Sequence, residues 1–496
     1  MTVNPRVNPK KLRPYDEPPK RRRTLVPDGP DSAATGFLVA AVIWFVVAAG
    51  LGTLALGMRL APFEVSFPFG IFDLGFELTV DRVDYAFINA TVYGWLTNAG
   101  FAALAFMTPR LLGRRIVAEK GLNLAMAIWN LALLGGMASL YVFDWGPNAP
   151  LTAFPWLIDG GLAFAALIVT GAFLATAGSA VRSAYVSLWF GGIALLALLG
   201  LTGLNAGMGL LEFFFDLPAL TVALGSVFIE RAVLVLWLLG MAYAALYYVV
   251  PRATGRPLES AGLAMLAWVT WLGLAPLSAL EVLTDTSVPF IFTTIGGVGS
   301  MLLLLPAALT VVNLALSTQG RWSLLFGSGP LAFAAVSAAF LFATGLLEAI
   351  GALRSVQSLV GGTDWVRGAF VWATLGTFTF AALAMSEHAI PRLLRRAWGG
   401  GPLSAAQLWL VFVGATLAGL ALMGGGMAEG SLRGQAASPE AIAEGIMGYR
   451  VLALGGVALV AGGALATLVN VFFAYTSGEP ADYVVPGAPA TATAGH

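Results

Sequence analysis

Long apolar segments, separated by short polar ones, run along nearly the whole chain. A helix needs about 20 apolar residues to cross a bilayer core of about 30 Å, because lipid offers no partner to an open backbone. Segments of that length are found at residues 35–58, 86–108, 121–143, 155–177, 184–206, 228–250, 259–283, 289–316, 330–353, 365–390, 404–427 and 449–475. The pattern therefore predicts an all-α polytopic membrane protein with twelve transmembrane helices.

Polar stretches flank these segments at both ends of the chain. Residues 1–34 include the basic, proline-rich KKLRPYDEPPKRRR, and residues 476–496 are mostly small or polar. Neither composition supports a packed core, and the first stretch lacks the apolar core of a signal peptide. We therefore predict a disordered basic cytoplasmic arm (1–34), a membrane domain (35–475) and a flexible cytoplasmic tail (476–496).

Basic residues between the predicted spans indicate the orientation, because cytoplasmic loops carry an excess of Lys and Arg. The connections on the side of the N-terminal arm hold Arg110, Arg114, Arg115, Lys120, Arg182, Arg252, Arg256, Arg321, Arg392, Arg395 and Arg396. The opposite side holds aromatic or acidic segments such as FPFGIFDLGFELTVD. Both termini are predicted to be cytoplasmic, in a bacterial-type inner (plasma) membrane.

A Pro-Arg pair ends the second, sixth and tenth predicted helices. The sequences are MTPRLLGRR, YVVPRATGR and AIPRLLRR, and Pro109, Pro251 and Pro391 are separated by 142 and then 140 residues. This spacing suggests three groups of four helices in a pseudo-threefold ring. The alternative is that Pro-Arg simply ends a helix at the cytoplasmic side, since Pro cannot continue a helix and Arg prefers that side.

The amino-acid composition limits the partners and cofactors that this chain can have. Apolar residues make up 58% of the chain and charged residues 10%, as expected of a polytopic membrane protein. The 26 basic and 26 acidic residues balance, so nucleic acid is not an expected partner. The lack of cysteine excludes disulfides, iron-sulfur ligation, thiolate-bound copper and covalently attached haem for this chain. The two histidines are His388 and His496.

Several segments resemble a known family. They are LYYVVPRATGRPLES (246–260), LPAALTVVNLALSTQGRW (305–322) and SVQSLVGGTDWVRGAFVWATLG (355–376), followed by IPRLLRR. They resemble subunit I of the cbb3-type cytochrome c oxidases, part of the haem-copper oxidase superfamily that also includes nitric oxide reductases. The resemblance runs over the predicted helices two to eleven in order. It implies the pseudo-threefold bundle, haem b and copper as cofactors, and integral membrane partner subunits, some of them cytochrome-bearing.

The resemblance also implies six metal-binding histidines, three of them haem ligands. Two haem ligands belong to a Gly-His-aliphatic-His motif after Thr-Asp-Trp, and this register holds Ala369 and Val371. The remaining haem ligand, on the second helix, corresponds to Phe87. We call these three the haem-register positions. Because all three ligands are missing, we expect no haem in this chain.

The copper ligands implied by the resemblance are missing as well. The first corresponds to Arg231 on the sixth helix, and a neighbouring pair on the seventh helix corresponds to Leu277 and Ser278. His388 lies about 25 Å of helix from Val371, so it cannot replace them. We therefore predict a divergent member of the family that holds neither haem nor copper.

Charged residues inside a membrane are costly, and they are functional candidates by default. The candidate polar sites are Glu230, Arg231, Glu348, Arg354, Asp364 and Arg367. We hypothesise that Arg231 replaces the positive charge of the metal and pairs with Glu348 or Glu281. The alternative is an interfacial arginine that contacts lipid headgroups or Glu230.

The remaining candidates have simpler explanations. Glu348 and Arg354 are six residues apart and do not share a helix face, so we expect them to have different partners. Thr363 or Asp364 can cap the tenth helix, and Arg367, one turn further on, can pair with Asp364.

Three functions remain open at this point. The first is a haem-free and copper-free structural or docking subunit of a respiratory-type membrane complex. The second is a transporter, or a quinone- or lipid-binding protein, that reuses the vacated interior. The third and least favoured is an active terminal oxidase or nitric oxide reductase subunit with unorthodox ligation. Loss of every expected ligand favours the first, in which the chain is not catalytic by itself.

Overall fold

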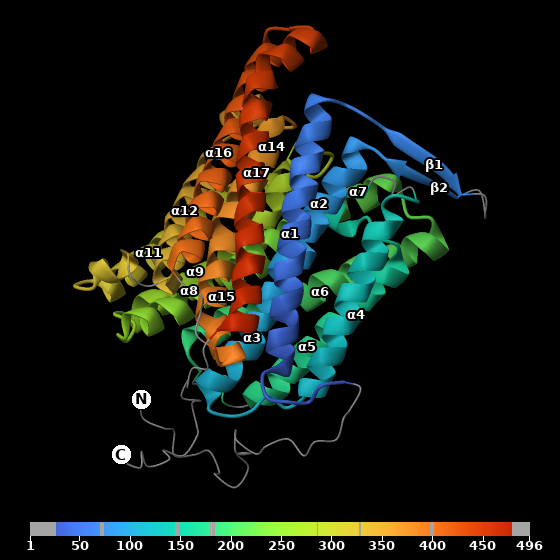
Figure 1. The fold of residues 1–496 in the computed structure, drawn as a ribbon. Helices are drawn as coiled ribbons and strands as arrows, with labels where there is room; N and C mark the ends of the chain where they lie inside the picture. The colour runs from blue at the N-terminus through green and yellow to red at the C-terminus, as the bar shows by residue number, and fades with distance from the viewer. Residues whose placement is uncertain are drawn as a thin grey trace, which may run out of the picture.

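Long helices run roughly parallel through the molecule, with a small two-stranded hairpin at one end (Figure 1). The computed structural model describes residues 26–69, 74–143, 148–178, 180, 184–284, 286–326, 329–396 and 401–478. The predictions for residues 1–25 of the arm and 479–496 of the tail lie outside the described residues. The first helix begins at Ser32 and the last ends at Ser477.

The elements follow the apolar segments closely. In chain order they are α1 (Ser32–Leu60), β1 (Val65–Phe69), β2 (Leu74–Leu78), α2 (Val80–Asn89), η2 (Ala90–Leu96), α3 (Thr97–Leu112), α4 (Glu119–Ser139), η3 (Pro150–Thr152), α5 (Trp156–Ala177), α6 (Val186–Phe215), α7 (Ala219–Ala232), η5 (Val233–Leu238), α8 (Leu239–Thr254), α9 (Ala261–Ser278), η6 (Ala279–Leu283), α10 (Phe290–Leu302), α11 (Leu304–Thr318), η7 (Trp322–Phe326), α12 (Gly329–Gly351), α13 (Arg354–Val360), α14 (Asp364–Val371), η8 (Trp372–Phe378), α15 (Thr379–Leu394), α16 (Gly401–Gly434) and α17 (Pro439–Ser477).

Eleven helical stretches of the described residues are long and apolar enough to cross a membrane. The remaining predicted span, 86–108, lies within a helix that continues from α2 through η2 into α3. Buried Asn89, Thr91, Thr97 and Asn98 make this helix less apolar than the others. The prediction of a polytopic helical membrane protein is confirmed, with eleven spans meeting the length and hydropathy requirement and a twelfth helix in the predicted place.

Two short strands were not predicted. β1 and β2 pair antiparallel, with Val65 opposite Leu78. The Glu77 amide donates to the carbonyl of Tyr141 at 2.9 Å, which attaches the hairpin to the chain just after α4. Strands of five residues leave only a brief alternating pattern, and the apolar residues around them resemble the edges of a span. We call this end of the bundle the hairpin end.

The three Pro-Arg helices share a further feature, a π-helical segment at the same place. η2, η5 and η8 end at Leu96, Leu238 and Phe378, each 13 residues before the proline of its Pro-Arg pair. Each helix then ends on a left-handed residue whose amide donates to the carbonyl of that proline: Gly113, Gly255 and Arg395. A π-helical segment makes a local bulge in a helix. The repeat therefore extends well beyond the Pro-Arg pairs.

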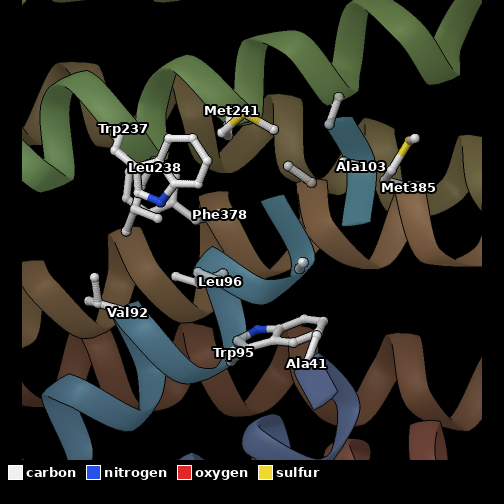
Figure 2. Close-up of a cluster of buried hydrophobic side chains, with 14 of the residues drawn as sticks. Ala41, Val92, Trp95, Leu96, Ala103, Trp237, Leu238, Met241, Phe378 and Met385 are labelled. Atoms are coloured by element: carbon white, nitrogen blue, oxygen red, sulfur yellow. The ribbon is translucent and has the colours of Figure 1, made fainter. Parts of the chain in front are cut away.

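Equivalent side chains of the repeat bind one another across the bundle. Trp95 Nε1 donates to Thr379 Oγ1 at 2.9 Å, and Trp237 Nε1 donates to Thr97 Oγ1 at 2.9 Å. The two tryptophans hold one repeat position and the two threonines another. Figure 2 shows both indoles in a cluster of buried side chains from all three helices. The tenth helix carries Thr377 at the tryptophan position, so the symmetry is incomplete.

Three rings meet near the Pro-Arg pairs of the same helices. Phe106, Tyr248 and His388, each three residues before its proline, pack edge to face with centroid distances of 6.1, 6.2 and 5.7 Å. His388 is buried in this ring cluster. The pseudo-threefold arrangement, rather than three independent helix ends, accounts for the Pro-Arg pairs.

Both ends of the described chain lie near the Pro-Arg pairs, at what we call the Pro-Arg end. Arg110 Nη2 binds Asp31 Oδ2 at 2.8 Å just before α1, and Arg396 Nη1 donates to the carbonyl of Gly478 at 2.9 Å just after α17. The start of α1 and the end of α17 therefore share one side of the bundle, as the orientation prediction requires. The cytoplasmic location of that side stays a prediction.

Candidate functional site

The haem-register positions are filled by hydrocarbon. Phe87 on α2 and Val371 on α14 are buried, and Ala369 is half-buried. The Phe87 ring meets the ring of Phe370 edge to face, with centroids 6.2 Å apart. Gly52 permits this packing, because a Cβ on it would stand 2.8 Å from a Phe87 ring carbon. None of these groups can coordinate iron.

Trp372 adds bulk beside the same positions. Its ring lies 4.6 Å from the ring of Phe340 on α12. On the other side it covers Gly419 of α16, where a Cβ would approach a ring carbon to 3.0 Å. Tight packing of this kind stabilises a protein interior, since voids lose dispersion contacts.

Arg231, in the copper register, lies between two carboxylates. Its Nη1 donates to Glu348 Oε1 at 3.1 Å, its Nη2 binds Glu348 Oε2, and Nη2 also lies 3.5 Å from Glu281 Oε2. The Arg231 side chain is 15% exposed. We call these three residues the Arg231 triad. The pairing hypothesised from the sequence is present in the structure.

The alternative partner, Glu230, is engaged elsewhere. Its Oε2 accepts from the amide of Leu151 at 3.4 Å, on the loop that holds η3. The sequence alternative in which Glu230 pairs with Arg231 is therefore wrong. Adjacent residues on a helix point in different directions, which is why Glu230 and Arg231 reach different neighbours.

The end of α9 explains how Glu281 reaches Arg231. After Ser278 the helix tightens into η6, and this turn carries Glu281 toward α7. Ser278 is buried, and its Oγ donates to the carbonyl of Ala275 at 2.8 Å. Leu277 is largely exposed on the bundle surface. The positions that correspond to the copper-binding pair therefore shape the turn and take no part in the triad.

A second ion network joins four helices at the hairpin end. Arg367 Nη1 donates to Asp364 Oδ1 at 3.2 Å, and Nη2 donates to Asp84 Oδ2 at 2.9 Å. Arg450 Nε donates to Asp364 Oδ2 at 2.7 Å, and Arg59 pairs with Asp84. The pairing of Arg367 with Asp364 was predicted. Arg59, Asp84 and Arg450 were missed, because their only sequence signal is a charge near a helix end.

The cap of α14 is supplied by Thr363 rather than Asp364. Thr363 Oγ1 accepts from the amide of Trp365 at 3.3 Å. The amide of Asp364 donates to Glu429 Oε2 at 2.9 Å, and its carboxylate is used by the arginines. Of the two caps considered from the sequence, the threonine is therefore the one present, and Asp364 is free to join the ion network.

Comparison with known proteins places this arrangement in a family. Residues 32–474 match the model of the family described as Cytochrome C and Quinol oxidase polypeptide I. The chain belongs to this family. The chain is 23% identical over 399 residues to the Cbb3-type cytochrome c oxidase subunit CcoN1 of Stutzerimonas stutzeri, covering 79% of this chain and 82% of the relative. It is 26% identical over 190 residues to cytochrome c oxidase subunit 1 of Rhodobacter capsulatus, covering 37% and 35%.

A solved structure supports the fold of the polypeptide I family. The structure of a haem-copper terminal oxidase dimer matches with a TM-score of 0.71 over 92% of this chain and 88% of that chain, at 16% identity. The likeness concerns the path of the backbone.

The residues at the positions that the sequence resemblance assigns to the metal ligands do not fit haem or copper. The copper register holds a guanidinium, which is permanently charged and would repel a metal cation. Among the residues that the structure describes, no group of three or more His, Asp or Glu side chains is placed to hold a metal ion. Side chains of Phe, Val and Ala offer no lone pair to iron.

Arg354 stands apart from the Arg231 triad. Its guanidinium lies 4.0 Å from the centre of the Phe290 ring, and its Nη2 donates to Thr294 Oγ1 at 3.2 Å. Glu348 binds Arg231 instead. Glu348 and Arg354 therefore have different partners, as predicted from their spacing.

Proposed function

We propose that this chain is a non-redox member of the polypeptide I family, a structural or docking subunit of a respiratory-type membrane complex that holds neither haem nor copper. The observation that carries the proposal is the Arg231 triad in the copper register. A guanidinium that shares two carboxylates is a stable replacement for a metal cation, and it leaves no open coordination position.

The haem-register positions support the same proposal. Phe87 and Val371 are buried hydrocarbon, and Phe370 and Trp372 pack beside them. This filling keeps the bundle dense without a cofactor. It also argues against the alternative in which a quinone, a lipid or a transported solute occupies the former haem space.

Helices α16 and α17 offer a surface for partner subunits. They contain 34 and 39 residues, which correspond to roughly 50 and 60 Å of helix, well beyond a bilayer core of about 30 Å. Their joined ends project past the rest of the bundle at the hairpin end (Figure 1). Met447, 53% exposed, presents an apolar side chain near the base of this projection, one turn before Arg450. We propose that it contacts integral membrane partners, cytochrome-bearing subunits among them.

The proposal includes a membrane orientation. With the Pro-Arg end at the cytoplasm of a bacterial-type inner membrane, both termini are cytoplasmic and the projection reaches the outer compartment. The arginines of the Pro-Arg end support this choice through the positive-inside rule.

The first experiment measures cofactor content. The chain is expressed alone, purified in mild detergent, and assayed by pyridine haemochrome and by elemental analysis for copper. We expect neither cofactor at stoichiometric amounts. Haem or copper at one equivalent in the isolated chain would overturn the proposal.

The second experiment measures docking in the native membrane. The tagged full chain is purified with its partners, which are identified by mass spectrometry. Met447→Glu should reduce the recovery of partner subunits, because it places a charge on the apolar face of the projection. The matched control is Val117→Glu, since Val117 is 63% exposed near the start of α4, at the other end of the bundle. Equal loss in both variants, or recovery of the chain alone, would contradict a docking role.

A further inference from the structure

A cavity of about 460 Å³ lies at the hairpin end, and its lining residues include no member of the Arg231 triad and no haem-register position. It is formed by the last turns of α4 and α6, the first turns of α5 and α7, and the segment around η3. Its volume is in the range of small-molecule sites. The side chains that give it chemical character are Asp159, Asn205, Glu212, Phe154, Trp156 and Phe213.

Asp159 gives the cavity a buried negative group. The residue is 3% exposed, and its Oδ1 has no hydrogen-bond partner in the described structure. The Asn205 side chain lies beside the carboxyl group in the cavity wall. Asp159 lies in the first turn of α5, where the helix dipole favours a negative charge. A buried carboxylate with an unused oxygen is costly unless a cation or a donor reaches it.

The other charge that lines the cavity has the same sign. Glu212 comes from the last turns of α6 and is partly exposed, so it stands nearer to solvent than Asp159. Among the described residues that line the cavity there is no Lys or Arg. The cavity therefore carries two carboxylates and no internal counter-ion.

Aromatic rings make up much of the remaining wall. Trp156 and Phe213 stand side by side with ring centroids 5.9 Å apart, and Phe154 covers Gly136, where a Cβ would approach the ring to 2.6 Å. The π faces of aromatic rings attract cations, most strongly the weakly hydrated organic ones. A metal ion is less suitable, since the described residues hold no cluster of three ligating groups.

We propose that this cavity binds an organic ammonium ion. The Asp159 carboxylate is its buried counter-ion, Glu212 attracts it at the mouth, and the Trp156 and Phe213 rings contact its alkyl groups. The site is independent of the docking role, because it uses other residues and requires no partner subunit.

Choline is a suitable probe, and its neutral isostere 3,3-dimethyl-1-butanol is the matched ligand control. Isothermal titration of the purified full chain in detergent should show saturable binding of choline and at least about tenfold weaker binding of the alcohol. Equal binding of the two ligands would overturn the proposal, as would the absence of choline binding or a Ca²⁺ ion that competes with choline one to one.

Substitutions of the residues that line the cavity test whether choline binds there. Asp159→Asn should abolish choline binding, whereas Trp156→Leu and Glu212→Gln should weaken it by about tenfold or less. The control is Asp216→Asn, because Asp216 is exposed just after α6 and lies outside the cavity. If Asp159→Asn does not fold, the other two variants still decide. Unchanged binding in Trp156→Leu and Glu212→Gln would place the ligand elsewhere.

Discussion

The positions that the family resemblance assigns to the haem and copper ligands are occupied in opposite ways. Val371 and Arg231 each lie 20 residues before the proline of their helix, so they stand at comparable depth. One is now buried hydrocarbon and the other is a charged group with two carboxylate partners. The two positions differ in their neighbours: Arg231 has Glu281 and Glu348 within reach, whereas Val371 is buried among other side chains.

The apolar packing at the haem register and the ion cluster at the copper register should lose stability differently when they are mutated. When a buried apolar side chain is shortened, the loss of stability should increase with the volume of the cavity that it leaves. An ion cluster depends on every member, since the removal of one leaves the others buried and uncompensated. Thermal unfolding of the detergent-solubilised protein measures the stability of each variant.

The largest effect is expected from Arg231→Leu. It leaves Glu348 and Glu281 close together without a counter-charge, and it should cost about 3–5 kcal/mol. The triple variant Arg231→Leu, Glu281→Gln, Glu348→Gln removes the charges together and should recover most of that loss. A single variant as stable as the wild type would mean that the triad contributes nothing to stability.

Phe87→Ala should cost about 3 kcal/mol through the cavity that it leaves beside Gly52 and Phe370. Phe87→Leu should cost less, because it leaves a smaller hole. The matched control is Phe164→Ala, since Phe164 is exposed on the lipid-facing side of α5. If both alanine variants lose the same stability, close packing at the haem register is not the reason for the loss.

Arg367→Leu should cost about 1–2 kcal/mol, less than Arg231→Leu, although both arginines bind two carboxylates. Each partner of Arg367 keeps another arginine: Asp84 keeps Arg59, and Asp364 keeps Arg450. The Arg367 side chain is also 29% exposed, so water screens what remains. A loss as large as that of Arg231→Leu would show that the network has no such redundancy.

Trp95→Phe should have the smallest effect, about 1 kcal/mol, from the lost hydrogen bond to Thr379. Combined with Thr379→Val in a double-mutant cycle, it should show a coupling energy of the same size. Strictly additive losses of stability would mean that the hydrogen bond between Trp95 and Thr379 has no coupling energy.

The sequence predicted the helices well because a membrane imposes a single strong rule on apolar length. It also predicted the repeat, since the Pro-Arg pairs recur at nearly even spacing. It missed η2, η5 and η8, because a π-helical bulge has no local signature in apolar composition. It also missed the β1–β2 hairpin, whose strands contain five residues each and lie beside the spans.

Within the site, local contacts were easier to predict than distant ones. Arg367 and Asp364 are three residues apart on one helix, so their pairing follows from helix geometry. Arg59, Asp84 and Arg450 come from three other helices, and nothing in their local sequence says that those helix ends meet. The same holds for the cavity around Asp159, whose walls come from α4, α5, α6 and α7.

The sequence by itself determined that this chain crosses a membrane many times, that Pro-Arg pairs recur at nearly even spacing, and that its two histidines are His388 and His496. These properties follow from composition, spacing and residue identity. Only the tertiary structure decided that Phe87 meets Phe370, that Arg231 takes Glu348 and Glu281 instead of Glu230, and that Asp159 faces a cavity with an unused oxygen. The reason is physical: burial and pairing depend on which helices are neighbours, and that follows from the packing of the whole bundle.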